Sequence, residues 1–192
     1  MNNKKLKKKY VVFSRELTQR PDTAHEIHDV LCANAAANIG YSSVLVYPEH
    51  NKSSLNPLGL LSPFNPRQPD NDFVEFYDVQ GNLEIAPLPM PWPIDRVGGK
   101  FTHSSTIVTK YYLPVHILPH TKIVHTRDWN FVKAAIKNQI PIIYERHYFQ
   151  EKPFDQEIVN SPYFQIAITQ SEPIRESLIK NGMPPEKVVW LH

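Results

Sequence analysis

The chain has 192 residues, of which 41% are hydrophobic and 21% are charged, with a formal net charge of +2. This length and composition suit one globular domain, and no apolar run approaches the roughly 18 residues that span a bilayer. The single Cys32 excludes an internal disulfide and a multi-cysteine zinc site, so we expect a reducing, cytoplasmic location.

A basic segment opens the chain, and we predict a disordered tail over residues 1–9 before one folded domain over residues 10–192. It holds five of the 21 basic residues: Lys4, Lys5, Lys7, Lys8 and Lys9. Without them 16 basic residues face 19 acidic ones, and this slight acidic excess argues against nucleic-acid binding. The tail lacks the apolar stretch of a secretory signal. It is either a solubilising segment or a weak peripheral contact with anionic membrane, at about 1 kcal/mol per lysine near the surface.

The domain begins with the pattern of strand, helix, strand. Residues 10–13 form a continuous apolar run, which is typical of a strand buried on both faces. A polar loop over residues 14–22 leads into a helix that ends near Asn38, before Gly40. A second strand is predicted over residues 44–47.

The residues of this first helix suggest both its cap and its inner face. Asp22 or Thr23 is the expected N-cap. Apolar residues at helical spacing predict an inner stripe, made of Ala24, Ile27, Leu31 and Ala35.

The middle of the chain is rich in proline, with nine of the 18 prolines between residues 48 and 93. Proline removes a backbone donor, so this stretch cannot be one helix or a central strand. We predict a helical turn or short strand over residues 73–79 and a third strand over residues 83–86. A helix is predicted over residues 106–118, kinked or shortened at Pro114, with one inner side: Ile107, Tyr111, Val115 and Leu118.

A second unit of strand, helix and strand follows between residues 121 and 150. A short apolar run at residues 123–124 ends in the polar sequence His125-Thr126-Arg127-Asp128. Asp128 is the expected cap of a helix over residues 129–138. A second run at residues 140–144 ends in Glu145-Arg146-His147.

The last segment predicts one more strand and helix. Residues 164–169 read as a strand, Ser171 caps a helix that runs to Lys180, and residues 188–191 are extended. The alternation of strands and helices predicts an α/β fold, a Rossmann-like three-layer sandwich with a mainly parallel sheet of about six strands.

Polar clusters follow three of the predicted strands, at the edge where parallel sheets bind ligands. They are Arg15 with Glu16, Arg127 with Asp128, and Glu145 with His147. An arginine fork at such an edge suits a phosphate or carboxylate. Glu145 and His147 alternate about Arg146 and are expected to face the same side. Ser171 begins a helix after another strand and is a candidate for anion binding there.

Cofactor and metal signatures are weak. The first loop has no Gly-x-Gly-x-x-Gly, which disfavours a nicotinamide oxidoreductase, and Gly98-Gly99-Lys100 lacks the rest of a phosphate-binding loop. His25, His28 and Cys32 could share one helix face like half of a metal site, but no partner cluster is evident in the sequence. We therefore predict no metal and no bound cofactor.

Three segments resemble the N-terminal domain of retaining GT-B glycosyltransferases, in glycosyltransferase group 1, the family 4-like proteins. They are HTRDWNFVKAAIKNQIPIIYERHYF at 125–149, FQIAITQSEPIRESLIKNGMPPEKVVWLH at 164–192, and the opening strand and helix with NIGYSSVLVYPE at 38–49. The first loop lacks the paired glycines of many members, which argues against its contact with donor phosphate.

The resemblance implies two facing Rossmann-like domains, of which the N-terminal one binds the acceptor and the C-terminal one the nucleotide sugar. Glutamates separated by seven residues, the donor-site signature of the family, do not occur in this chain. By resemblance it is an acceptor domain without its donor domain, and its partners would be a sugar, lipid or glycan acceptor, a C-terminal GT-B domain in cis or trans, or a second copy of itself. The alternative is a non-enzymatic binding module of the same fold.

The resemblance also suggests roles for individual side chains. Arg127 and His147 would be the catalytic residues in polar contact with substrate. The substrate-binding residues would be Arg15, Thr23, Asp128, Glu145 and Ser171.

Overall fold

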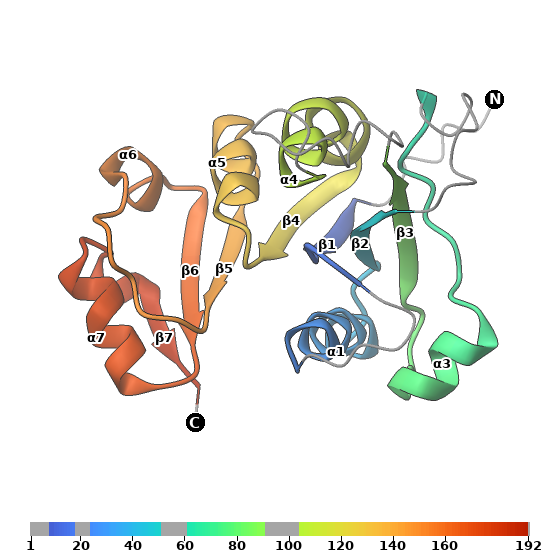
Figure 1. The fold of residues 1–192 in the computed structure, drawn as a ribbon, viewed down its shortest axis with the longest axis horizontal. Helices are drawn as coiled ribbons and strands as arrows, with labels where there is room; N and C mark the ends of the chain where they lie inside the picture. The colour runs from blue at the N-terminus through green and yellow to red at the C-terminus, as the bar shows by residue number, and fades with distance from the viewer. Residues whose placement is uncertain (1–7, 18–23, 51–60, 91–103, 192) are drawn as a thin grey trace.

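Seven strands form one all-parallel sheet in the order β3-β2-β1-β4-β5-β6-β7 (Figure 1). The computed structural model describes residues 8–17, 24–50, 61–90 and 104–191. The strands are β1 Lys9–Phe13, β2 Ser43–Glu49, β3 Glu84–Pro89, β4 Thr121–Thr126, β5 Ile142–Arg146, β6 Phe164–Thr169 and β7 Val188–Trp190. The predicted Rossmann-like α/β class is confirmed, with one strand more than expected.

Helices cover both faces of this sheet. They are α1 Ala24–Asn38, α3 Asn71–Tyr77, α4 Ser104–Ile107, the π-helix η3 Val108–Ile117, the 3₁₀ helix η4 Leu118–His120, α5 Trp129–Lys137, α6 Gln156–Val159, α7 Glu172–Lys180 and the 3₁₀ helix η5 Pro185–Lys187. Figure 1 shows α1 and α3 below the sheet and α4 and α5 above it. None of the helices in the described ranges is long and apolar enough to cross a membrane.

The interior strand β1 contributes side chains to both layers of the core. Val11 and Phe13 face one layer, where the Phe13 ring stacks on Phe131 of α5 with centroids 4.3 Å apart. Val12 faces the opposite layer and packs with Val30 of α1. Burial on both faces explains why β1 is a continuous apolar run.

The strand β1 begins at Lys9, which the sequence had assigned to the basic tail. Its ammonium group forms an ion pair with Glu84 at the start of β3. The edge position of β3 accommodates Pro87 and Pro89, because their missing N–H groups are not needed to pair with a further strand; Ile85 makes an isolated bridge with Arg67 on that outer side. Residues 1–7 of the predicted tail lie outside the described residues.

The predicted inner face of α1 is wrong. Ile27 and Leu31 are 37% and 49% exposed, and Ala35 is also exposed. The buried residues are instead small or polar: Glu26, Asp29, Val30, Ala33, Asn34, Ala36 and Ala37. Small residues let the helix approach the sheet closely. Asp29 pairs with Arg127 just after β4, and Asn34 accepts from the backbone N–H of Gln80 in the loop before β3, which a hydrophobic pattern cannot reveal. The predicted caps Asp22 and Thr23 and the side chain of Ala24 lie outside the described residues.

The helix predicted over residues 106–118 is three short elements, α4, η3 and η4. Tyr111 and Val115 were expected to face inward but are 57% and 66% exposed, while Tyr112 and Leu113 are buried. Pro114 has no N–H for an α-helical ladder, and the i→i+5 bonding of a π-helix changes which residues share a face. Ile107 and Leu118 are buried as predicted.

Candidate functional site

A pocket of about 350 Å³ lies at the carboxyl edge of the sheet, beside the point where the strand order reverses between β1 and β4. Ligands of open α/β sheets bind at such a switch point. The described residues that line it are Phe13, Arg15, Glu16, Asp29, Arg127, Asp128, Trp129, Glu145, Arg146, His147 and Tyr148. The three polar clusters predicted from the sequence therefore meet in one pocket.

Asp128 forms the buried floor of this pocket. Its Oδ1 accepts from the backbone N–H groups of Asn130 and Phe131, at 2.7 and 3.0 Å, and so caps α5 as predicted. Its Oδ2 accepts from Ser105 Oγ and from Arg15 Nε, both at 2.7 Å. Both oxygen atoms are engaged within the protein, so Asp128 fixes the position of Arg15, whose side chain is 58% exposed.

Arg127 joins α1 to the end of β4. Its Nε and NH2 groups both donate to Asp29 Oδ1, at 3.1 and 2.6 Å. Its NH1 lies 3.4 Å from Nδ1 of His147. Since a guanidinium group only donates, Nδ1 of His147 is the accepting atom of this contact.

Glu145 is the centre of a buried polar cluster behind His147. The side chain of Glu145 is 3% exposed, and its Oε1 accepts from His147 Nε2, as the alternation about Arg146 predicted. Its Oε1 also lies 2.7 Å from His28 Nε2 of α1, and its Oε2 lies 3.1 Å from His125 Nε2 of β4. Three imidazoles thus surround one carboxylate.

Two further side chains extend this cluster. Cys32 Sγ lies 3.2 Å from His28 Nε2, one helical turn along α1. Tyr10 of β1 places its hydroxyl 3.1 Å from His125 Nδ1. With Nε2–H of His125 directed at Glu145, the Tyr10 hydroxyl donates to Nδ1, and β1, β4, β5 and α1 are linked through polar groups.

The cluster shifts the pKa values of its members in opposite directions. Burial alone raises the pKa of Glu145, but the hydrogen bonds from His125, His147 and His28 outweigh it and hold that pKa well below its usual range. The hydrogen-bonding contacts of the His28 ring with Cys32 and with Glu145 raise the pKa of His28 from 6.5 to about 10. Glu145 is therefore an anion and His28 a cation at neutral pH.

The stabilising contribution of His28 should depend on pH. Because its folded-state pKa of about 10 exceeds the ordinary 6.5, this contribution is complete below pH 6.5 and is lost as the pH rises through about 10. The groups that face His28 are Cys32 on the same helix and Glu145 and His147 at the end of β5.

The measurement is the difference in free energy of unfolding between wild type and His28→Gln, by urea denaturation with a chelator present. We expect a larger difference below pH 6.5 than near pH 10. A difference that stays constant over this range would contradict the raised pKa.

Other predicted site residues lie elsewhere. Ser171 is the N-cap of α7 but makes no side-chain capping bond, and it is not among the described residues that line the pocket. Thr23 and the side chain of His25 lie outside the described residues.

Several residues of the site did not stand out in the sequence as site residues. The sequence shows no partners for His28 and Cys32, and the fold supplies them as His125 and Glu145. His125 and Arg127 alternate as Glu145 and His147 do, and the same period-two argument would have placed His125 on this face. Asp29 and Tyr10 carry no such local signal, since their partners are 98 and 115 residues away.

Comparisons with known proteins bear on the fold. No protein-family model matches the sequence, and no curated protein matches it either. The UDP-N-acetylglucosamine 2-epimerase of Rickettsia bellii is a structural match, with a TM-score of 0.53, 18% sequence identity, and coverage of 96% of this chain and 44% of that one. HepE of Anabaena, solved in complex with UDP and glucose, matches with a TM-score of 0.50, 11% identity, and coverage of 96% and 44%.

This chain therefore spans less than half the length of the structures that it matches. At such identities the likeness establishes architecture. The protein has the fold of one half of a GT-B protein.

Proposed function

We propose that this chain is the acceptor-binding domain of a glycosyltransferase, which transfers a sugar from a nucleotide-sugar donor to an acceptor hydroxyl. A C-terminal GT-B domain, in cis or in trans, would bind the donor. The observation that carries the proposal is the polar pocket at the switch point between β1 and β4, with Arg127 and His147 on its wall.

Arg127 and His147 can recognise hydroxyl and phosphate groups in complementary ways. The guanidinium group is a fixed cation that donates to oxygen, so it suits a sugar oxygen or the developing charge of a leaving diphosphate. The Nδ1 atom of His147 accepts, so an acceptor hydroxyl could replace Arg127 NH1 as its donor and free that NH1 for a sugar oxygen. Glu145 would hold His147 in this tautomer from behind, and Asp128 would hold Arg15 at the rim.

The proposal can be tested by titrating this chain with a panel of glycan acceptors and with UDP-sugars, and by monitoring binding by NMR. We expect acceptors to shift the resonances of Arg127 and His147, and UDP-sugars to bind weakly. Arg127→Ala should weaken acceptor binding by about tenfold or more, because a hydrogen bond to a charged group contributes about 1.5–3 kcal/mol. His147→Gln removes the imidazole and should also weaken acceptor binding.

Arg175→Ala is the matched control, since Arg175 lies on α7 in a partly exposed ion pair with Glu172, away from the pocket residues. It should leave acceptor binding unchanged. Tight UDP-sugar binding by the chain alone, or acceptor binding insensitive to Arg127→Ala and His147→Gln, would count against the proposal. With a donor domain present, the same two variants should cut the rate of transfer.

Epimerisation of a nucleotide sugar is the second candidate, favoured by the structural match to an epimerase. The two candidate functions differ in their need for an acceptor: sugar transfer requires one, whereas epimerisation does not. Products formed from a UDP-sugar with the donor domain present but without acceptor would favour epimerisation, whereas a strict need for acceptor would favour transfer.

A further inference from the structure

The side chains around Glu145 form a set of metal-binding donors that the proposed function does not use. His28 and Cys32 come from α1, His125 from β4 and Glu145 from β5. The donor atoms of Cys32, His125 and Glu145 all lie within 4.8 Å of one another. His28 Nε2 adds a fourth donor, 3.2 Å from Cys32 Sγ and 2.7 Å from Glu145 Oε1.

These separations suit a tetrahedral ion. Bonds of about 2.0–2.1 Å to nitrogen and oxygen and about 2.3 Å to sulfur put neighbouring ligand atoms roughly 3.3–3.8 Å apart. The Cys32–His28, His125–Glu145 and His28–Glu145 contacts are 3.2, 3.1 and 2.7 Å, so the donors would have to move apart by less than about 1 Å to admit an ion.

Hydrogen bonding alone does not satisfy both contacts of His28. Its Nε2 atom has a single bonding position, either an N–H or a lone pair, yet it faces both Cys32 Sγ and Glu145 Oε1. A cation among the donors would satisfy both contacts together. A set of imidazole, thiolate and carboxylate favours Zn²⁺ and related transition ions over Ca²⁺ and Mg²⁺, which prefer oxygen.

The surrounding residues match the outer partners that metal ligands usually have. The Tyr10 oxygen lies beside Nδ1 of His125, where it can accept the N–H of a metal-bound imidazole. His147 hydrogen-bonds Glu145, as ligating carboxylates require. The His28 side chain is 36% exposed, which gives an ion a route from solvent.

We propose that His28, Cys32, His125 and Glu145 form a binding site for a Zn²⁺-class ion that clamps α1 onto β4 and β5. His147 is a positioning residue here, because its Nδ1 faces the donors of Arg127 and its Nε2–H is directed at the carboxylate. The proposal does not depend on the chain's acting on sugars.

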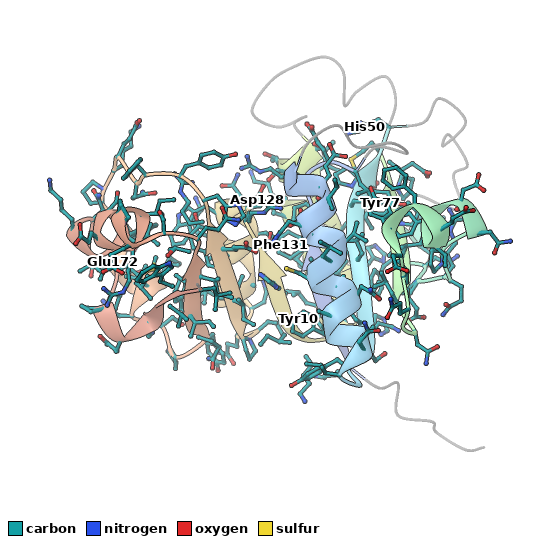
Figure 2. The ribbon with its side chains drawn as sticks, turned by 90° about the horizontal axis from the view of Figure 1, so that it is seen from below. Tyr10, His50, Tyr77, Asp128, Phe131 and Glu172 are labelled. Atoms are coloured by element: carbon teal, nitrogen blue, oxygen red, sulfur yellow. The ribbon has the colours of Figure 1, made fainter. Side chains whose placement is uncertain are left out.

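Co²⁺ titration of the purified chain, followed by absorption, is the first test. We expect saturation at one equivalent, with the visible bands of tetrahedral Co²⁺ and a sulfur-to-cobalt charge-transfer band. Cys32→Ser should abolish the charge-transfer band, and Tyr10→Phe should weaken binding by about 10- to 100-fold, as loss of an outer partner does. His50→Gln is the control, an exposed histidine after β2 that Figure 2 shows apart from Tyr10, and it should bind Co²⁺ like wild type.

The second test needs no variant, because Cys32 is the single cysteine of the chain. Zn²⁺ should slow the reaction of Cys32 with a thiol reagent by at least about tenfold, as expected for a coordinated thiolate, and a chelator should restore the rate. An octahedral Co²⁺ spectrum without the charge-transfer band, or a thiol rate unaffected by saturating Zn²⁺, would overturn the proposal. So would a loss of binding in His50→Gln equal to that in His28→Gln.

Discussion

Glu145→Gln should lower the free energy of unfolding by about 3 kcal/mol in the metal-free protein. Glu145 is 3% exposed and is the shared acceptor for His28, His125 and His147. Removing one partner of a buried ionic group typically costs about 3–5 kcal/mol, because the remaining charge is left uncompensated. The amide oxygen can still accept one hydrogen bond, so we expect the lower end of this range. Urea denaturation with a chelator present measures the effect.

Glu172→Gln is the matched control for this prediction. Glu172 is also a glutamate in an ion pair, with Arg175 one turn along α7, but its side chain is 40% exposed. Exposed pairs contribute about 0–1 kcal/mol, so this variant should unfold almost as wild type does. Similar losses in the two variants would show that the Glu145 cluster adds nothing beyond an exposed ion pair.

Asp128→Ala should lower the free energy of unfolding by about 3 kcal/mol. Loss of an N-cap costs about 0.5–2 kcal/mol, and here it frees the amides of Asn130 and Phe131 at the start of α5. The variant also leaves the buried Ser105 hydroxyl without this acceptor, which adds about 1–3 kcal/mol. The bond to Arg15 adds little, because that side chain is 58% exposed.

Asp155→Ala is the control that separates the stability lost with a helix N-cap from the stability lost with the buried contacts of Asp128. Asp155 is also an aspartate N-cap, accepting from Glu157 N at 3.0 Å, but it is exposed at the start of α6. Its loss should cost about 1 kcal/mol. Asp128→Asn, which keeps an oxygen acceptor for the cap, should fall between the two alanine variants. Equal losses in Asp128→Ala and Asp155→Ala would show that the buried contacts of Asp128 contribute nothing.

Local patterns in the sequence predicted most of the secondary structure. β6 and α7 match their predicted residues, with Ser171 at the N-cap and Gly182 in the left-handed conformation that ends the helix. Asp128 caps α5 as predicted. These features depend on residues within a few positions of one another, so the sequence displays them directly.

Local patterns misplaced the inner faces of two helices. In α1 the solvent-facing side carries the large hydrophobic residues Ile27 and Leu31. The side that faces the sheet instead buries three polar residues: Glu26, Asp29 and Asn34. In η3 the i→i+5 bonding of the π-helix around Pro114 places different residues on the buried side than an α-helical repeat would. In both helices the sheet, and not the periodicity of the helix itself, decides which side faces inward.

By itself the sequence determined the order of strands and helices, the parallel α/β class, and the edge at which Arg127, Asp128, Glu145 and His147 gather, since each follows from short-range spacing. Only the tertiary structure decided what these residues contact. Asp29 and Arg127 are 98 residues apart, and His28 reaches Glu145 only because α1 packs on β1 and β2, next to β4 in the sheet. His28 and Cys32 on α1 are only half of the proposed metal site. The order of the strands brings His125 and Glu145 to them, and spacing along the chain does not encode that order.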